Sequence, residues 1–216
     1  MLELTEYRKS VREHFIGFYE NNDAAHLINH ADEVVDNALE ICRVLEKPDW
    51  YKLAIVAGYG HDMYTAVNRK DHHYMAMDYI LSAEFQALGF LEGKQEHVMA
   101  AQAALTHRAS WSEGYHSEFS EVLATADRGR PDLRKYYLRS YLYAITKEGK
   151  SRDDAIFHSL IHIREKFGVD GTANMPPLFF RFYKDELAII RKKVMTMTEE
   201  EMAELIKEDV EELGYV

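Results

Sequence analysis

Apolar residues recur along almost the whole chain at the three- to four-residue spacing of amphipathic helices. His30, for example, lies on the same helical stripe as Val34 and Ile41, so this stripe is expected to face a core. No segment sustains the strict alternation of a β-strand. The pattern predicts helices at about 4–20, 25–47, 50–61, 73–88, 94–108, 116–127, 131–148, 151–167, 177–193 and 198–213, with a polar loop at 66–72.

The predicted fold class is therefore all-α. A chain of 216 residues with 47% hydrophobic residues can bury a sizeable core, and its four prolines and eleven glycines leave little room for long linkers. We expect one helical bundle in residues 1–150 and a helical C-terminal extension in residues 151–216, packed on the same domain.

The composition of the chain disfavours nucleic acids and membranes as binding partners. With 37 acidic and 26 basic side chains the net charge is −11, which disfavours general nucleic-acid binding. The single cysteine, Cys42, excludes an internal disulfide. The N-terminal residues lack the apolar run of a signal peptide, so none is expected, and no apolar run reaches membrane-spanning length. A cytoplasmic protein without membrane attachment is expected. The basic segment "RGRPDLRKYYLR", residues 128–139, still offers a local site for a small anion.

Polar residues with ligand chemistry lie at core-facing or helix-terminal positions. His30 lies within one apolar helix, the pair His61-Asp62 ends another, and Asp127 follows the apolar run "EVLATA". A buried carboxylate is costly without a cation, whereas imidazole and carboxylate groups from separate helices of a bundle can converge on one metal ion. A single buried histidine is more often hydrogen-bonded core, but the four residues together predict a metal site.

These four residues resemble the signature of the HD superfamily of metal-dependent phosphohydrolases, which is a histidine, an adjacent His-Asp pair and a distant aspartate. His30, His61, Asp62 and Asp127 match it, and "HLINHADEVVDNAL" is similar to the first signature helix of the family. The resemblance covers roughly residues 23–135. It implies an HD-type all-α domain within residues 1–150 and hydrolysis of a phosphate ester, without identifying the substrate.

Further histidines extend the resemblance. His72 and His73 precede a predicted helix, and His97 and His107 lie on the next one. Relatives that hold two metals add histidines in this region, and there the counterpart of Asp62 bridges the ions. The second site is carried over most readily to His107 with His72 or His73, while His97 could lean toward it. The alternative for His72, His73 and His97 is a solvent-facing position near a helix start.

The resemblance also implies the cofactor and the chemistry. One or two divalent ions per chain are expected, from among Mn, Fe, Ni, Co, Zn and Mg. Asp62 would bind metal and orient or deprotonate the attacking water, and His107 would bind a second ion or protonate the leaving oxygen. The expected substrate is a small phosphorylated molecule, a nucleotide above all.

Phosphate recognition is expected from the basic segment, because many relatives carry a lysine where this chain has Thr65. Arg128 and Arg130 are the first candidates, with Arg134 in the same segment, since guanidinium groups pair with phosphate. Arg69 and Lys70 are the next candidates.

Two other functions stay open at this point. Some relatives use a two-iron form of the site for oxygen-dependent chemistry, and a degenerate HD module can sense nucleotides without turnover. The apolar stretch "MPPLFFRFY", residues 175–183, is typical of a packing or oligomer surface, so a homo-oligomer is also open.

Overall fold

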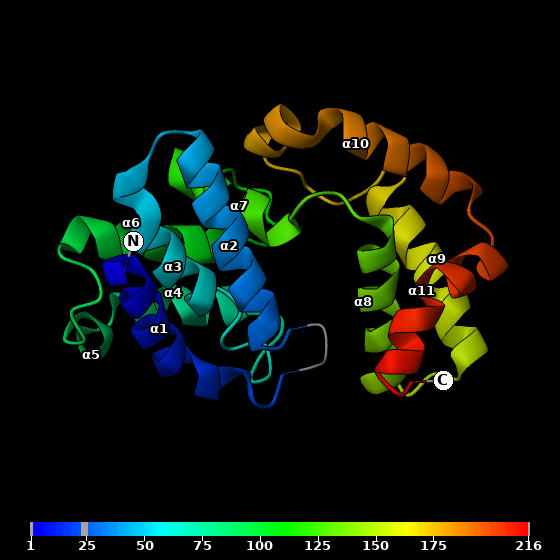
Figure 1. Ribbon diagram of the computed structural model, residues 1–216, viewed down its shortest axis with the longest axis horizontal. Coiled ribbons are helices and arrows are strands. Elements are labelled where there is room, and N and C mark those ends of the chain that lie inside the picture. The colour runs from blue at the N-terminus through cyan, green and yellow to red at the C-terminus, as the bar shows by residue number, and fades with distance from the viewer. Residues whose placement is uncertain (1, 23–25, 216) are drawn as a thin grey trace. The chain divides into compact units, whose positions relative to one another are not determined.

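The computed structural model describes residues 2–22 and 26–215, and every regular element within these ranges is a helix, which confirms the all-α prediction. The helices are drawn in Figure 1, which labels those of α type. They are α1 (Leu2–Phe15), η1 (Ile16–Tyr19), α2 (Ile28–Val44), η2 (Pro48–Trp50), α3 (Tyr51–Gly60), α4 (His72–Leu81), α5 (Ala83–Gln86), α6 (Lys94–Thr106), α7 (Glu118–Arg128), α8 (Leu133–Thr146), α9 (Arg152–Phe167), α10 (Pro177–Thr196) and α11 (Glu199–Glu212). Among the described residues, none of these helices has the length and apolar character that a membrane crossing requires.

Several helix boundaries differ from the predicted ones by a few residues. The first helix changes to 3₁₀ geometry at Ile16, and the second begins at Ile28, while residue 25 lies outside the described residues. The helix predicted at 73–88 is broken at Ser82, which is extended (φ −65°, ψ 150°) and accepts a hydrogen bond from the backbone N–H of Phe85. Serine favours such a helix-starting position over a helix interior, because its hydroxyl competes for backbone hydrogen bonds.

The described residues form two compact units. One contains residues 2–22, 26–129 and 174–180, and the other contains residues 130–173 and 181–215. The helix α10 carries a non-helical residue, Tyr183 (φ −133°, ψ 19°), shortly after the chain enters the second unit. The division into a domain at 1–150 and an extension at 151–216 stays a prediction.

The first unit is built around α3. Every residue of this helix from Leu53 to Gly60 is buried, and α1, α2, α6 and α7 all pack against it (Figure 1). At Gly58 the backbone of α2 approaches closely, because a Cβ atom there would lie 2.6 Å from Cγ2 of Val35. Glycine is therefore the residue that lets α2 and α3, which both carry site residues, come together.

A polar network fixes α1 and α2 against the C-terminal end of α3. The guanidinium of Arg12 donates to both carboxylate oxygens of Asp32, at 2.8 and 3.0 Å from Nε, and Tyr59 Oη donates to Asp32 Oδ1 at 2.7 Å. Arg8 Nε donates to the Tyr59 hydroxyl at 3.1 Å. Because these bonds join three helices, they restrict sliding of α2 along α3.

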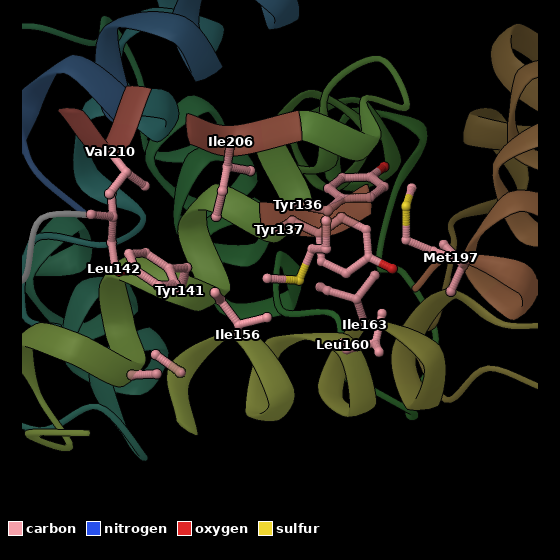
Figure 2. Close-up of a cluster of buried hydrophobic side chains, with 14 of the residues drawn as sticks. Tyr136, Tyr137, Tyr141, Leu142, Ile156, Leu160, Ile163, Met197, Ile206 and Val210 are labelled. Atoms are coloured by element: carbon pink, nitrogen blue, oxygen red, sulfur yellow. The ribbon is translucent and has the colours of Figure 1, made fainter. Parts of the chain in front are cut away.

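The second unit has its own core. Figure 2 shows aromatic and aliphatic side chains of α8, α9 and α11 directed toward one another, with Tyr137 and Leu160 among them. The helix α10 adds Ile190 and Val194 to this cluster. The helix α11 is started by a reciprocal capping box, in which Thr198 and Glu201 each bond the other's backbone N–H.

Candidate metal centre

Five helices of the first unit supply the candidate site. His30 lies on α2, His61 caps the C-terminus of α3 and Asp62 follows it. The helix α4 contributes His72, α6 ends at its C-cap His107, and Asp127 lies in the last turn of α7. The four histidines and Asp62 are all buried, with exposures of 0–6%. The imidazole and carboxylate groups thus lie near the ends of five helices, and these ends meet in the interior of the first unit.

Four of these residues form a first group of donor atoms. Nε2 of His61 lies 3.3 Å from Oδ2 of Asp62 and 3.7 Å from Oδ1 of Asp127. Nε2 of His30 lies 3.2 Å from the same oxygen of Asp127 and 3.8 Å from Oδ2 of Asp62. The structure therefore brings together the four residues that the sequence predicted for one ion.

Asp62 also takes part in a second group. Its other oxygen, Oδ1, lies 3.0 Å from Nε2 of His72 and 3.3 Å from Nε2 of His107. The two imidazole nitrogens are themselves 3.3 Å apart. Among the described residues, two groups of three donors could hold an ion, His30 with His61 and Asp62, and Asp62 with His72 and His107.

The backbone fixes which nitrogen of each ring faces the site. Nδ1–H donates to the carbonyl three residues earlier in His61 (Gly58, 2.7 Å), His72 (Arg69, 2.9 Å) and His107 (Ala104, 2.6 Å). In the neutral imidazole, Nε2 is then an unprotonated acceptor. The lone pairs of His72 and His107 accordingly face each other, and Nε2 of His61 has no hydrogen-bond partner among the described residues. Buried acceptors that converge in this way are stabilised by a metal ion or a proton between them.

The electrostatics of the cluster also favour a cation. Burial opposes the imidazolium form of His61, but the carboxylates of Asp62 and Asp127 outweigh it and raise the pKa of His61 to about 9. Burial likewise opposes ionisation of Asp62, yet the surrounding histidines hold the pKa of this carboxyl well below its usual range. The two carboxylates are thus ionised and draw positive charge to their centre.

The donor separations suit a metal ion. Two ligands placed about 2.1 Å from one ion at angles of about 90–109° are themselves about 3.0–3.4 Å apart. The separations of 3.0 and 3.3 Å in the second group fall in this range, and those of the first group, 3.2–3.8 Å, are slightly wider. Mixed imidazole and carboxylate donors are typical of divalent transition-metal sites.

Two predicted ligands lie outside both groups. Nδ1 of His73 is 3.5 Å from Nη1 of Arg108, and burial together with this guanidinium lowers the pKa of His73 to about 4. His97 donates from Nδ1 to the carbonyl of Gly93, and its ring packs at 6.1 Å from the ring of Phe85. His72 is thus the member of the His72-His73 pair that joins the donor cluster, and the structure does not bring His97 to it.

The two arginines predicted to bind phosphate lie in different surroundings. Arg128 donates from Nη1 to the carbonyls of His107 (2.6 Å) and Ala124 (2.7 Å), and from Nε to the carbonyl of Asn174 (3.0 Å). Its side chain therefore holds the end of α6 against the end of α7. Arg130 belongs to the second unit, where its largely exposed side chain lies 3.4 Å from Glu186. A role for either arginine in phosphate binding stays a prediction.

Sequence reasoning did not find Asn22. Its side-chain amide donates to the carbonyl of His26 at 2.9 Å and reaches the carbonyl of Asp62 at 3.5 Å, so it supports the turn that carries the shared carboxylate. Its Oδ1 is buried without a hydrogen-bond partner in the described part of the chain. An asparagine after an amphipathic helix is an ordinary turn residue, and no periodicity or spacing could have distinguished it.

No protein-family model, curated protein or solved structure matches this chain. The function has therefore to be inferred from the residues themselves, and their arrangement is that of a buried histidine and aspartate cluster suited to binding metal.

Proposed function

We propose that this chain is a divalent-metal-dependent phosphohydrolase of the HD type, which hydrolyses a phosphate ester of a nucleotide or a similar small molecule. The observation that carries the proposal is the carboxylate of Asp62, whose two oxygens face two different pairs of histidines. A carboxylate shared in this way is suited to joining two ions, and a pair of ions can bind both the attacking and the leaving oxygens of a phosphoryl group.

The donor residues divide into two sets, one for each proposed ion. His30, His61, Asp127 and one oxygen of Asp62 would hold the first, and His72, His107 and the other oxygen of Asp62 the second. The preponderance of imidazole favours Mn, Fe, Co, Ni or Zn over Mg, which prefers an all-oxygen shell. When bound, such ions lower the pKa of a coordinated water and neutralise charge on the phosphoryl oxygens.

The residues of the chain would supply the remaining steps. Both oxygens of Asp62 face Nε2 atoms of histidines that would bind the same ions. This carboxylate is therefore less available to deprotonate the attacking water than we expected from the sequence. Asp127 directs Oδ1 toward His30 and His61, while its side chain keeps 18% of its surface exposed. Its Oδ2, which lies 4.0 Å from Nη1 of Arg128, faces neither His30 nor His61 and would orient a water molecule.

A second candidate function is oxygen-dependent chemistry on two irons. Each donor group consists of two histidines and one carboxylate, a ligand set that non-haem iron enzymes use with open positions for oxygen. The two functions differ in what turnover requires. Hydrolysis would proceed with manganese in the absence of oxygen, whereas oxygenase activity would require both iron and oxygen.

The test combines metal analysis with a screen for phosphate release. The purified protein, loaded anaerobically with manganese or iron, would be assayed against nucleoside mono-, di- and triphosphates and cyclic nucleotides. We expect release of phosphate or cleavage of the ester with manganese under nitrogen, and loss of it in Asp62→Ala. Turnover that occurs only with iron and oxygen would replace the hydrolase by the oxygenase. Ligand binding without turnover under either condition would indicate a sensing module.

A further inference from the structure

We propose that a cavity of about 320 Å³ in the first unit recognises the base and the ribose or phosphate of a nucleotide, beside the second donor group. The side chains that carry the argument are Lys70, His73, Tyr74, Arg108, Trp111 and Glu113. This inference rests on the proposed function for its link to catalysis, although binding in the cavity can be measured without turnover. The volume lies at the lower end of the range for small-molecule sites, as a mononucleotide requires.

Two residues that line the cavity directly follow metal-donor residues in the sequence. Its residue His73 directly follows His72, with the two rings 5.5 Å apart, and Arg108 directly follows His107. Both of these histidines belong to the donor group that includes Oδ1 of Asp62. A molecule that occupied the cavity would thus lie next to the segments that place two of the metal donors.

Cationic groups in the cavity remain available for an anion. Arg108 uses Nη1 to donate to the carbonyl of Lys70 and lies close to Nδ1 of His73, while its Nε and Nη2 make no hydrogen bond to the described residues. The ammonium of Lys70 likewise forms no ion pair within the part of the chain described. By contrast, Arg128 already donates to three backbone carbonyls, so Lys70 and Arg108 are better placed for phosphate.

The other lining residues fit the uncharged part of a nucleotide. Tyr74 is 44% exposed and lies 4.2 Å from the ring of His73, so its outer face can stack on a base. Trp111 is held by a hydrogen bond of 2.7 Å from its indole N–H to the carbonyl of Gly114, which keeps its ring beside His73. Glu113 supplies acceptor oxygens for ribose hydroxyls or an exocyclic amine.

The mixed charge of the lining argues for this class of ligand. Lys70 and Arg108 are balanced by Asp71 and Glu113, so the cavity has no excess of positive charge for a simple anion. Asp71 is partly occupied by a hydrogen bond from Asn68. A ligand that combines phosphate, hydrogen-bond donors and an aromatic ring uses all of these groups, whereas inorganic phosphate uses only two.

The test uses Trp111 as a fluorescent reporter. The chain contains two tryptophans, and Trp50, which packs against Phe119, would be replaced by phenylalanine to leave Trp111 alone. The four common nucleoside 5′-monophosphates, the matching nucleosides and inorganic phosphate would be titrated into this full-length variant, with and without manganese. We expect saturable quenching by at least one monophosphate, at least tenfold stronger binding than for phosphate alone, and a roughly tenfold weaker Kd in Lys70→Ala and in Tyr74→Ala.

Lys9→Ala is the matched control, because Lys9 is an exposed lysine of α1 outside the cavity, and its Kd should equal that of the parent. Circular dichroism melts would confirm that each variant is folded, and Tyr74→Leu would replace Tyr74→Ala if the latter is not. No quenching by any monophosphate, or equal Kd values for parent, Lys70→Ala and a folded Tyr74 variant, would overturn the proposal. Binding without hydrolysis would support the cavity while contradicting the proposed hydrolase, so the two failures can be told apart.

Discussion

Oδ1 of Asp62 lies 3.0 Å from Nε2 of His72, while the other oxygen of the same carboxylate faces His61. Asp62, which follows the C-cap of α3, therefore belongs to two donor groups at once. His72, by contrast, belongs to one of them. The two residues should consequently have different effects on metal content.

The number of metal ions bound per chain should distinguish the role of Asp62 from that of His72. We expect up to two ions per chain in the parent, about one in His72→Ala, and strongly reduced content of both in Asp62→Ala, because only Asp62 serves both groups. Elemental analysis after metal saturation and desalting measures this. His97→Gln is the control, since His97 lies outside both groups, and its content should match the parent. An Asp62→Ala protein that keeps two ions would refute the shared-carboxylate assignment.

Metal affinity should rise with pH. The pKa of His61 is raised to about 9, so its ring is mostly protonated at neutral pH and has to lose this proton before it can bind an ion. Between pH 6 and 8 the apparent affinity should rise roughly tenfold per pH unit, in proportion to the neutral fraction. Chelator competition at several pH values gives the slope, and calorimetry in buffers of different ionisation enthalpy gives the released proton. A flat profile would contradict the prediction.

Acid should weaken the network around Asp32. Burial opposes ionisation of this carboxyl, but Arg12 and Tyr59 outweigh it, so the pKa of Asp32 is lowered. Its contribution is therefore present above the unfolded value near pH 4 and is lost as the pH falls through the lower, folded pKa. We expect Asp32→Asn to reduce the free energy of unfolding by about 1–2 kcal/mol at pH 7, since the network is partly exposed. Urea unfolding at pH 7 and pH 3 should show a smaller difference for this variant than for the parent.

Gly58 should not accept a side chain. A methyl group there would meet Cγ2 of Val35 at 2.6 Å, and overpacking of this kind costs about 1–3 kcal/mol. We expect Gly58→Ala to lower the melting temperature and to weaken metal binding, because α2 carries His30 and α3 leads to His61. The double variant Gly58→Ala with Val35→Ala should recover part of both losses. Parent-like stability in Gly58→Ala alone would show that α2 is free to shift.

Arg128 should act on stability as well as on turnover. Its hydrogen bonds to the carbonyls of His107, Ala124 and Asn174 are lost in Arg128→Ala, and hydrogen bonds from a charged donor contribute about 1.5–3 kcal/mol each at most. We expect a lower melting temperature together with slower turnover. Slower turnover with an unchanged melting temperature would instead favour direct contact with phosphate, as the sequence had indicated.

Helix content and the main donors were predictable, because both depend on local patterns. The stripe that contains His30 and the apolar run before His61 define which faces are buried, whatever the packing partner. The choice between His72 and His73 depended on where α4 begins, and the periodicity did not determine that position. His97 could not be excluded from sequence, since on an ideal helix it lies only about 80° around the axis from His107, yet it belongs to neither donor group.

The role of Arg128 was equally hidden in the sequence. A basic residue after a metal-binding aspartate suggests phosphate binding. In the structure, however, the guanidinium of Arg128 donates hydrogen bonds to three backbone carbonyls from segments far apart in the chain. Such partners are set by tertiary packing, and no local pattern reports them. The same holds for the cavity, whose lining comes from two separate segments around His73 and Arg108.

The hydrogen bonds that orient His61, His72 and His107 all end on backbone carbonyls, each three residues earlier in the same segment. In many metal proteins a side-chain carboxylate holds the ring, and a single substitution removes it. A carbonyl oxygen is present whatever residue occupies the position. Most point mutations should therefore leave the orientation of these three rings unchanged. Only a change that bends the backbone, such as a proline near Gly58, Arg69 or Ala104, would reorient them.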